Sequence, residues 1–165
     1  MTESRLQQEL KQRKPFASPA QETILGLLRT TDVVRRAIAQ AVNPQGVTMQ
    51  QYNVLRILRG AGREGLATLA IADRLVEQTP GITRLVDELE KRGLLARQRC
   101  AEDRRRVLCF LTKEGLKLVN TFDKPVAERG ESCLAALTQK EQRTLIKLLD
   151  RIREHLANPS GGKAP

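Results

Sequence analysis

The chain has 165 residues, of which 40% are hydrophobic and only four are aromatic, and its formal net charge is +10. This length suits one domain, and a core of aliphatic side chains favours helices over a β-sandwich. The excess of cations implies a polyanionic partner, either nucleic acid or an anionic membrane surface.

Motifs for catalysis are missing from the sequence. It has one histidine and no metal-binding, redox, nucleophile-elbow or phosphate-loop motif, so we expect no enzymatic activity, no cofactor and no metal. No apolar run approaches the roughly 18 residues of a membrane span, and the N-terminus lacks a signal-peptide core, so we expect no membrane partner. Three cysteines without metal-like spacing indicate a reducing cytoplasm.

Capping signals divide the first half of the chain into helices. Residues 1–17 are polar and form either a short helix or a frayed tail. Beyond them, Ser18 and Thr48 each stand three residues before a capping-box glutamine and open an apolar helical stripe. Thr68 is expected to cap a short third helix. The sequence therefore predicts helices over about 18–42, 48–60 and 68–75.

A fourth helix is expected over residues 79–92. Thr79 would cap it, Pro80 would take its first position, and Gly93 would follow its last turn. Helical periodicity assigns the buried face to Ile82, Leu85, Val86 and Leu89. The outward positions of its N-terminal half are then Thr79, Gly81, Thr83, Arg84 and Asp87.

The apolar period then changes from that of a helix to that of a strand. Segments 94–100 and 107–111 are predicted to form a β-hairpin, in which Val107 roots the returning strand in the core. A hairpin centred between residues 103 and 104 would place Cys109 opposite Gln98. We therefore expect no disulfide between Cys109 and Cys100.

The C-terminal third is predicted to be helical. Thr112 begins a long helix that bends or breaks near Pro125, and Thr138 opens a terminal helix with a capping box and an apolar stripe. The terminal residues 157–165 form a flexible tail.

The order of these elements defines the fold class. A short helix, a tight turn, a second helix and a basic hairpin make up the winged helix-turn-helix plan, in which the second helix is the recognition helix and the hairpin is the wing. The fold is thus predicted to be mainly α with a small β-hairpin. We expect one domain over residues 18–156, with the winged helix-turn-helix at 48–112 and further helices at 18–42 and 113–156.

Charge supports DNA as the partner of this unit. Between Lys91 and Arg106, seven cations stand against two anions, and six of the seven are arginines, which suit phosphate and a narrow minor groove. Thr83 and Arg84 can meet base edges or phosphate, and Gly81 permits a close backbone approach. The predicted DNA-binding residues are Thr79, Gly81, Thr83, Arg84, Arg99, Asp103, Arg104, Arg105 and Arg106.

Within this set, the wing residues have different expected roles. Arg105 is expected to enter the minor groove, and its neighbouring arginines to contact the DNA backbone. Asp103 either pairs with a neighbouring arginine to fix the shape of the loop or is an ordinary turn residue, and both can hold.

Short motifs at fixed spacing run from residue 83 to residue 115. They are Thr83-Arg84, Val86-Asp87, Leu89-Glu90, Gly93-Leu94, Asp103-Arg104-Arg105, and Leu111-Thr112 with Gly115. Together they resemble the MarR family of bacterial transcriptional regulators. The resemblance implies a homodimer that interlocks through its first and last helices and binds a pseudo-palindromic operator.

The resemblance also implies a small effector. Members of the family are usually repressors that a small anionic or phenolic molecule releases from DNA, after binding in a crevice beside the second helix. Met49, Tyr52 and Arg56 lie on that helix here. The first two are equally well explained as core residues and Arg56 as a surface cation.

Two alternatives stay open. The chain could be a redox-sensing regulator on the same scaffold that uses Cys100, Cys109 or Cys133. It could also be a winged-helix module that contacts protein or RNA through its basic wing.

Overall fold

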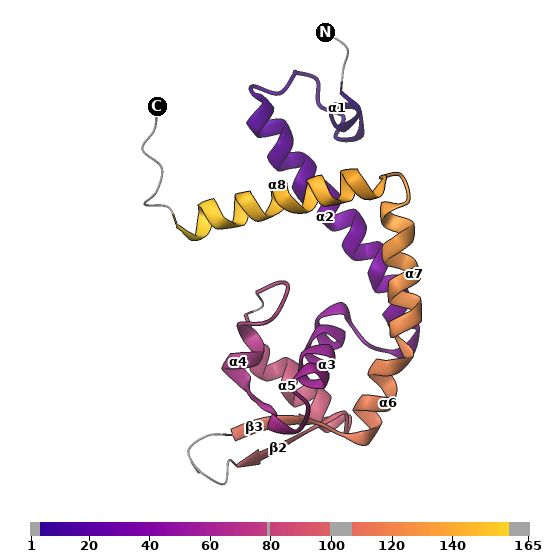
Figure 1. The fold of residues 1–165 in the computed structure, drawn as a ribbon, viewed down its shortest axis with the longest axis vertical. Coiled ribbons are helices and arrows are strands. Elements are labelled where there is room, and N and C mark those ends of the chain that lie inside the picture. The colour runs from indigo at the N-terminus through magenta and orange to yellow at the C-terminus, as the bar shows by residue number, and fades with distance from the viewer. Residues whose placement is uncertain (1–3, 79, 100–106, 159–165) are drawn as a thin grey trace.

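The computed structural model describes residues 4–78, 80–99 and 107–158 of the chain, and it confirms a mainly helical winged-helix fold. Figure 1 shows a lower lobe, which contains the short helices and the sheet, and an upper part built from long helices. The elements are α1 (Arg5–Glu9), α2 (Pro19–Val42), η1 (Asn43–Gln45), α3 (Met49–Ala61), η2 (Gly62–Glu64), β1 (Leu66–Ala67), α4 (Thr68–Ala72), α5 (Ile82–Lys91), β2 (Leu95–Arg99), β3 (Val107–Leu111), α6 (Lys113–Thr121), α7 (Asp123–Leu134) and α8 (Gln139–Ala157).

Three of the predicted helix starts are confirmed by their hydrogen bonds. The hydroxyl of Ser18 accepts from the backbone N–H of Gln21 at 3.2 Å, with Pro19 as the first residue of α2. Thr48 and Thr138 each complete a capping box at the start of α3 and α8. The Thr138 hydroxyl and backbone N–H also lower the pKa of the Glu141 carboxyl, because both donate to its charged form.

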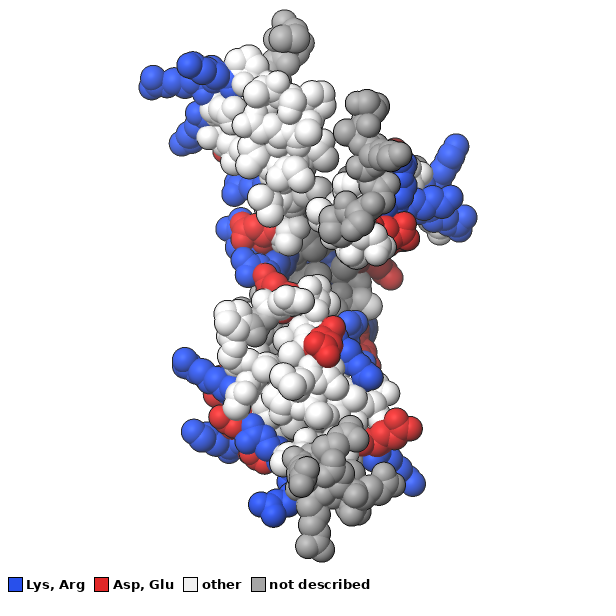
Figure 2. Space-filling model, turned by 90° about the vertical axis from the view of Figure 1, so that its left-hand side faces the viewer, with Lys and Arg blue, Asp and Glu red and all other residues white. Residues whose placement is uncertain are grey.

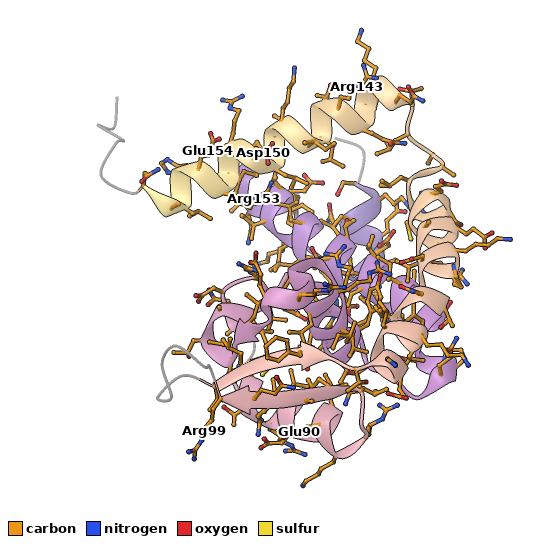
Figure 3. The ribbon with its side chains drawn as sticks, turned by 60° about the horizontal axis from the view of Figure 1, so that its bottom comes forward. Glu90, Arg99, Arg143, Asp150, Arg153 and Glu154 are labelled. Carbon is orange, nitrogen blue, oxygen red and sulfur yellow. The ribbon has the colours of Figure 1, made fainter. Side chains whose placement is uncertain are left out.

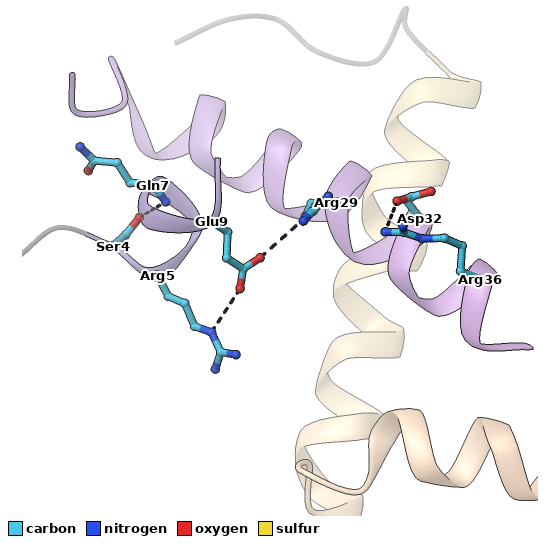
Figure 4. Close-up of polar contacts among 7 residues, drawn as sticks. All are labelled: Ser4, Arg5, Gln7, Glu9, Arg29, Asp32 and Arg36. Carbon is cyan, nitrogen blue, oxygen red and sulfur yellow. Dashed lines mark hydrogen bonds and ion pairs between the residues drawn. The ribbon is translucent and has the colours of Figure 1, made fainter. Parts of the chain in front are cut away.

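The N-terminal segment forms a short helix, α1, that lies against α2. Ser4 caps it, and the Glu9 carboxylate pairs with Arg5 at 3.2 Å and with Arg29 of α2 at 3.8 Å (Figure 4). A methyl group added at Gly26 of α2 would lie 3.7 Å from the side chain of Leu6, so α1 and α2 pack closely there. Of the two alternatives for residues 1–17, the structure shows the helix.

The starts of α4 and α5 differ from the predictions. Thr68 does not cap α4, because the N-cap is Ala67 and the Thr68 hydroxyl instead lies 3.9 Å from the Cys109 sulfur. Pro80 is not the first residue of α5, because Gly81 follows it with φ 103° and forms the N-cap. This left-handed conformation suits glycine after proline in a turn, and it delays the helix to Ile82.

The predicted hairpin is confirmed as β2 and β3, and β1 adds a third strand, so that the antiparallel sheet has the order β1-β3-β2. Cys109 lies opposite Arg97 rather than Gln98, because seven residues separate Arg99 from Val107 and an odd connector centres the hairpin on a residue. Val107 does not root β3 in the core, since it is 40% exposed, whereas Cys109 is fully buried. Cys100 lies outside the described residues.

The end of α5 and the start of α6 meet at a close backbone contact. Gly93, with φ 69°, ends α5 in a Schellman motif, in which the Gly93 and Leu94 N–H groups donate to the Glu90 and Leu89 carbonyls. The Thr112 hydroxyl donates to the Gly93 carbonyl at 2.8 Å, and the Thr112 N–H donates to that of Leu94 at 3.2 Å. These hydrogen bonds fix the end of β3 to the end of the recognition helix α5.

The long C-terminal helix is broken, as predicted, but at Phe122, between α6 and α7. Phe122 is fully buried and its ring meets that of Tyr52 edge-on, with centroids 5.5 Å apart. Beside this contact, Arg59 of α3 binds both carboxylate oxygens of Asp123 at 2.9 Å. The hydrogen bonds between the two groups raise the pKa of Arg59 and lower that of Asp123.

Two long helices expose their apolar faces. On α8, Leu148 is 48% exposed and Leu156 72%, and Leu145, Ile146 and Ile152 are exposed as well. On α2, Ile24 and Leu28 are also exposed. Figure 1 shows α8 running across the upper part of the molecule, separate from the lower lobe, and no buried residue lies on it.

Candidate DNA interface

The recognition helix α5 and its N-cap present three of the predicted outward residues to solvent. Val86 and Leu89 are fully buried, while Gly81, Thr83 and Arg84 are exposed, as the helical period predicts. A methyl group added at Gly81 would meet nothing within 4 Å, so the backbone conformation alone accounts for this glycine. Asp87, which was also predicted to face outward, is partly buried and pairs with Arg97 of β2, and Thr79 lies outside the described residues.

Arg84 is an exposed cation with a defined neighbour. Its side chain is 86% exposed, and its Nε atom donates to the Glu88 carboxylate at 3.0 Å, one turn further along α5. The terminal nitrogens of the guanidinium remain at the surface, where a phosphate or the acceptor edge of a guanine can accept from them.

Two of the cations counted toward a DNA-binding charge are structural. The guanidinium of Arg97, on β2, forms ion pairs with two carboxylates of α5, those of Asp87 and, at 3.2 Å, Glu90. These contacts raise the pKa of Arg97, chiefly through the hydrogen bond to Asp87. Arg92 donates to the Gly46 carbonyl at 2.8 Å. Both guanidinium groups hold the recognition helix against its neighbours.

Arg99 is the predicted wing cation that the structure describes. Figure 3 shows its side chain at the end of β2, pointing away from the body of the protein. Asp103, Arg104, Arg105 and Arg106 lie outside the described residues. Figure 2 shows lysine and arginine side chains projecting from the lower lobe, with acidic side chains among them. The recognition helix and the described part of the wing therefore each carry an exposed arginine, Arg84 and Arg99.

The predicted effector residues lie on α3 but differ in exposure. Met49 is partly buried, Arg56 is exposed, and Tyr52 is only 7% exposed because it packs on Phe122. Asn53, beside Tyr52, has a buried Oδ1 atom without a hydrogen-bond partner. A shallow hollow of about 400 Å³ lies elsewhere, between α2 and α7, and none of the three predicted residues lines it.

The remaining chemical candidates are few. Cys109 is fully buried in the sheet, and Cys133 is partly buried on α7. In the part of the chain that the structure describes, no group of three or more His, Cys, Asp or Glu side chains is placed to hold a metal ion. Within the same ranges, no helix is long and apolar enough to cross a membrane.

A winged helix-turn-helix with an exposed, cation-bearing recognition helix is the fold of a DNA-binding regulator. Residues 47–107 match the sequence profile of the MarR family. The crystal structure of a MarR transcription factor from Planctomyces limnophilus is 42% identical, covers 82% of this chain and 98% of its own, and has a TM-score of 0.62. The chain belongs to the MarR family and is a DNA-binding transcriptional regulator, not an enzyme.

Other relatives add breadth to this assignment. The HTH-type transcriptional regulator PecS of Dickeya dadantii (strain 3937) is 26% identical over 92% of both chains. S. aureus MepR, in a crystal structure of its complex with DNA, is 26% identical in sequence. The match covers 78% of this chain and 94% of MepR, with a TM-score of 0.70. The crystal structure of the Streptomyces coelicolor regulator PcaV in complex with its natural ligand is 26% identical in sequence. The match covers 86% of this chain and 98% of PcaV, with a TM-score of 0.72.

Proposed function

We propose that the protein is a homodimeric, sequence-specific repressor that binds a pseudo-palindromic operator in the cytoplasm and is released by a small anionic or phenolic effector. The observation that carries the DNA-binding part is the exposure of Thr83 and Arg84 on a recognition helix that Arg92 and Arg97 fix to the scaffold. The winged helix-turn-helix at 48–112 would read the DNA, and residues 18–42 and 113–156 would form the dimer.

The exposed apolar faces support the homodimer. The apolar side chains of α8 lie on one side of the helix, and those of α2 are exposed as well, more than a soluble monomer would leave in water. A second copy of the chain would cover them in a two-fold arrangement, in which the same faces meet. Two recognition helices would then reach successive turns of the DNA.

The effector part of the proposal rests on α3. The unpartnered Asn53 oxygen lies on the same helix as Met49, Tyr52 and Arg56, and a ligand hydroxyl or N–H could donate to it, while Arg56 would attract an anion. This helix also contacts the α6–α7 junction through Tyr52 and Arg59, so a ligand there could change the orientation of the winged helix. PcaV, a relative of similar fold, is described with its natural ligand.

Replacing Arg84 by alanine is expected to weaken binding to the preferred duplex by about 1–3 kcal/mol and to relax discrimination at one base position. The reason is the loss of a bidentate donor to a base edge or phosphate. Fluorescence anisotropy with a labelled duplex, repeated with each single-base substitution, measures both effects. Arg105→Ala serves as the comparison, since loss of a backbone or minor-groove contact should weaken all duplexes similarly and lower the salt slope by about one.

The result that would contradict this role is clear. If Arg84→Ala bound every duplex as the unmodified chain does, α5 would not read the DNA. The chain would then fit better a module that contacts protein or RNA, which predicts no preference for any duplex over a random one. The burial of Cys109 opposes a redox role for that thiol. A variant with all three cysteines replaced by serine should respond to oxidant as the unmodified chain does.

A further inference from the structure

Glu88 is an acidic residue on the DNA-facing helix, where a carboxylate repels phosphate. It stands one turn after Arg84 on α5, and its side chain is 40% exposed. A pair of this kind on a helix surface usually contributes little to stability. The contacts of its two oxygen atoms indicate a different role.

The two carboxylate oxygens of Glu88 are bound on opposite sides. Oε1 accepts from Arg84 Nε at 3.0 Å, and Oε2 accepts from the side-chain amide of Gln51, on α3, at 3.2 Å. The carboxylate therefore connects the exposed arginine to a second helix, instead of forming a pair within one helix.

Gln51 is itself firmly held. It is only 7% exposed, and its side-chain oxygen accepts from the Thr48 backbone N–H at 3.2 Å, which is half of the capping box that starts α3. The same oxygen lies 3.4 Å from Arg92 Nη1. Because its oxygen is engaged in this way, the amide nitrogen of Gln51 is directed to Glu88, which fixes the position of the carboxylate.

The consequence for Arg84 follows from the geometry of a guanidinium group. It has five N–H donors, and one of them, on Nε, is occupied by Glu88. A guanidinium can bind a two-oxygen acceptor side-on, through Nε and one terminal nitrogen, or end-on, through its two terminal nitrogens. Because Nε is already bound to Glu88, the end-on pair of donors stays available. Holding the side chain in this orientation before binding reduces the rotamer freedom that DNA binding would otherwise remove.

We propose that Glu88 is a positioning residue for DNA sequence recognition: anchored by Gln51, it orients the end-on donors of Arg84 toward a base edge and lowers the attraction of this helix for phosphate in general. This inference rests on the proposed sequence-specific binding. Its carboxylate makes the Arg84–Glu88 pair neutral, so Arg84 adds specificity while adding little to non-specific binding.

The test compares Glu88→Ala with Glu88→Gln on a duplex selected from a random pool by the unmodified chain and on a random-sequence duplex. Both variants lose the same charge, so both should bind the random duplex more tightly, with a salt slope steeper by about one per protomer. They differ in one respect, because glutamine keeps an oxygen that can accept from Arg84. Glu88→Ala should bind the selected duplex about tenfold more weakly, and Glu88→Gln within about threefold of the unmodified chain.

A double variant separates positioning from a direct effect. Arg84→Ala combined with Glu88→Ala should bind the selected duplex no more weakly than Arg84→Ala alone, because Glu88 acts through Arg84. Glu131→Ala and Glu131→Gln, at an exposed position of α7, are matched controls for loss of a carboxylate. Thermal melting of each variant checks that the fold is intact.

Either of two results would overturn the inference: equal affinity of Glu88→Ala and Glu88→Gln for the selected duplex, or losses from Arg84→Ala and Glu88→Ala that multiply in the double variant. Failure of the proposed function gives a different result. In that case the unmodified chain itself would show no preference for a selected duplex over a random one.

Discussion

Replacing both Leu148 and Ile152 by glutamate is expected to make the protein monomeric. The variant should bind its operator at least about 100-fold more weakly than the unmodified chain. Both side chains belong to the exposed apolar face of α8. If this face meets a second copy, two carboxylates would be buried there without partners, at a high cost in free energy. A monomer engages one half-site and loses the gain of binding two linked half-sites. Sedimentation equilibrium and fluorescence anisotropy measure the two effects.

A control places two glutamates on the opposite side of the same helix, where they also replace two cations, so only its oligomeric state is compared. Lys147→Glu with Arg151→Glu changes exposed positions of α8 and should leave a dimer intact. The proposed dimer would be contradicted if the unmodified chain sedimented as a monomer. Its placement on the apolar face of α8 would be contradicted if the Leu148 and Ile152 variant stayed dimeric.

Replacing Gly115 by alanine is expected to lower the free energy of unfolding by about 3 kcal/mol. Gly115 lies in the first turn of α6, and an added Cβ would lie 1.9 Å from the Leu94 carbonyl oxygen, which is backbone and cannot rotate away. The helix would have to move back, and the hydrogen bond from the Thr112 N–H to that same carbonyl would be lost. Chemical denaturation monitored by circular dichroism measures the change.

Gly130 offers the corresponding control within α7. A Cβ added there would meet nothing within 4 Å, so Gly130→Ala should leave stability unchanged or raise it by up to about 1 kcal/mol, the helix-propensity difference. If the two variants were equally stable, the close approach of α6 to Leu94 would not be what selects glycine at position 115.

The parts of the fold that could be predicted from the sequence depend on contacts between near neighbours. Ser18, Thr48 and Thr138 were identified as caps because donor and acceptor are three residues apart. The buried and exposed sides of α5 followed in the same way from helical periodicity, and this placed Thr83 and Arg84 on the surface.

Several of the errors concern contacts between distant parts of the chain. β1 has two residues and no alternating pattern of its own, and it forms a strand only because β3 is beside it. The charge count from Lys91 to Arg106 includes Arg97, although it is paired in the fold, because its partners Asp87 and Glu90 belong to another element. Thr68 was predicted to be a cap, but it lies beside Cys109 of β3, which local spacing cannot reveal.

The same limit applies to the site. Arg84 was predicted from the sequence. Its connection through Glu88 to Gln51 was not, because Glu88 and Gln51 are 37 positions apart in the chain. An acidic residue one turn after the arginine is a sequence signal for the first step alone. The second step needed the packing of α3 against α5.

The most direct test of the central claim is selection of bound duplexes from a random pool by the unmodified protein at physiological salt. We predict enrichment of a pseudo-palindromic sequence whose half-sites are centred about one helical turn apart, because two recognition helices related by two-fold symmetry read successive turns of the major groove. A pool that stays random after repeated rounds, or an enriched sequence without two-fold symmetry, would contradict a homodimeric, sequence-specific regulator.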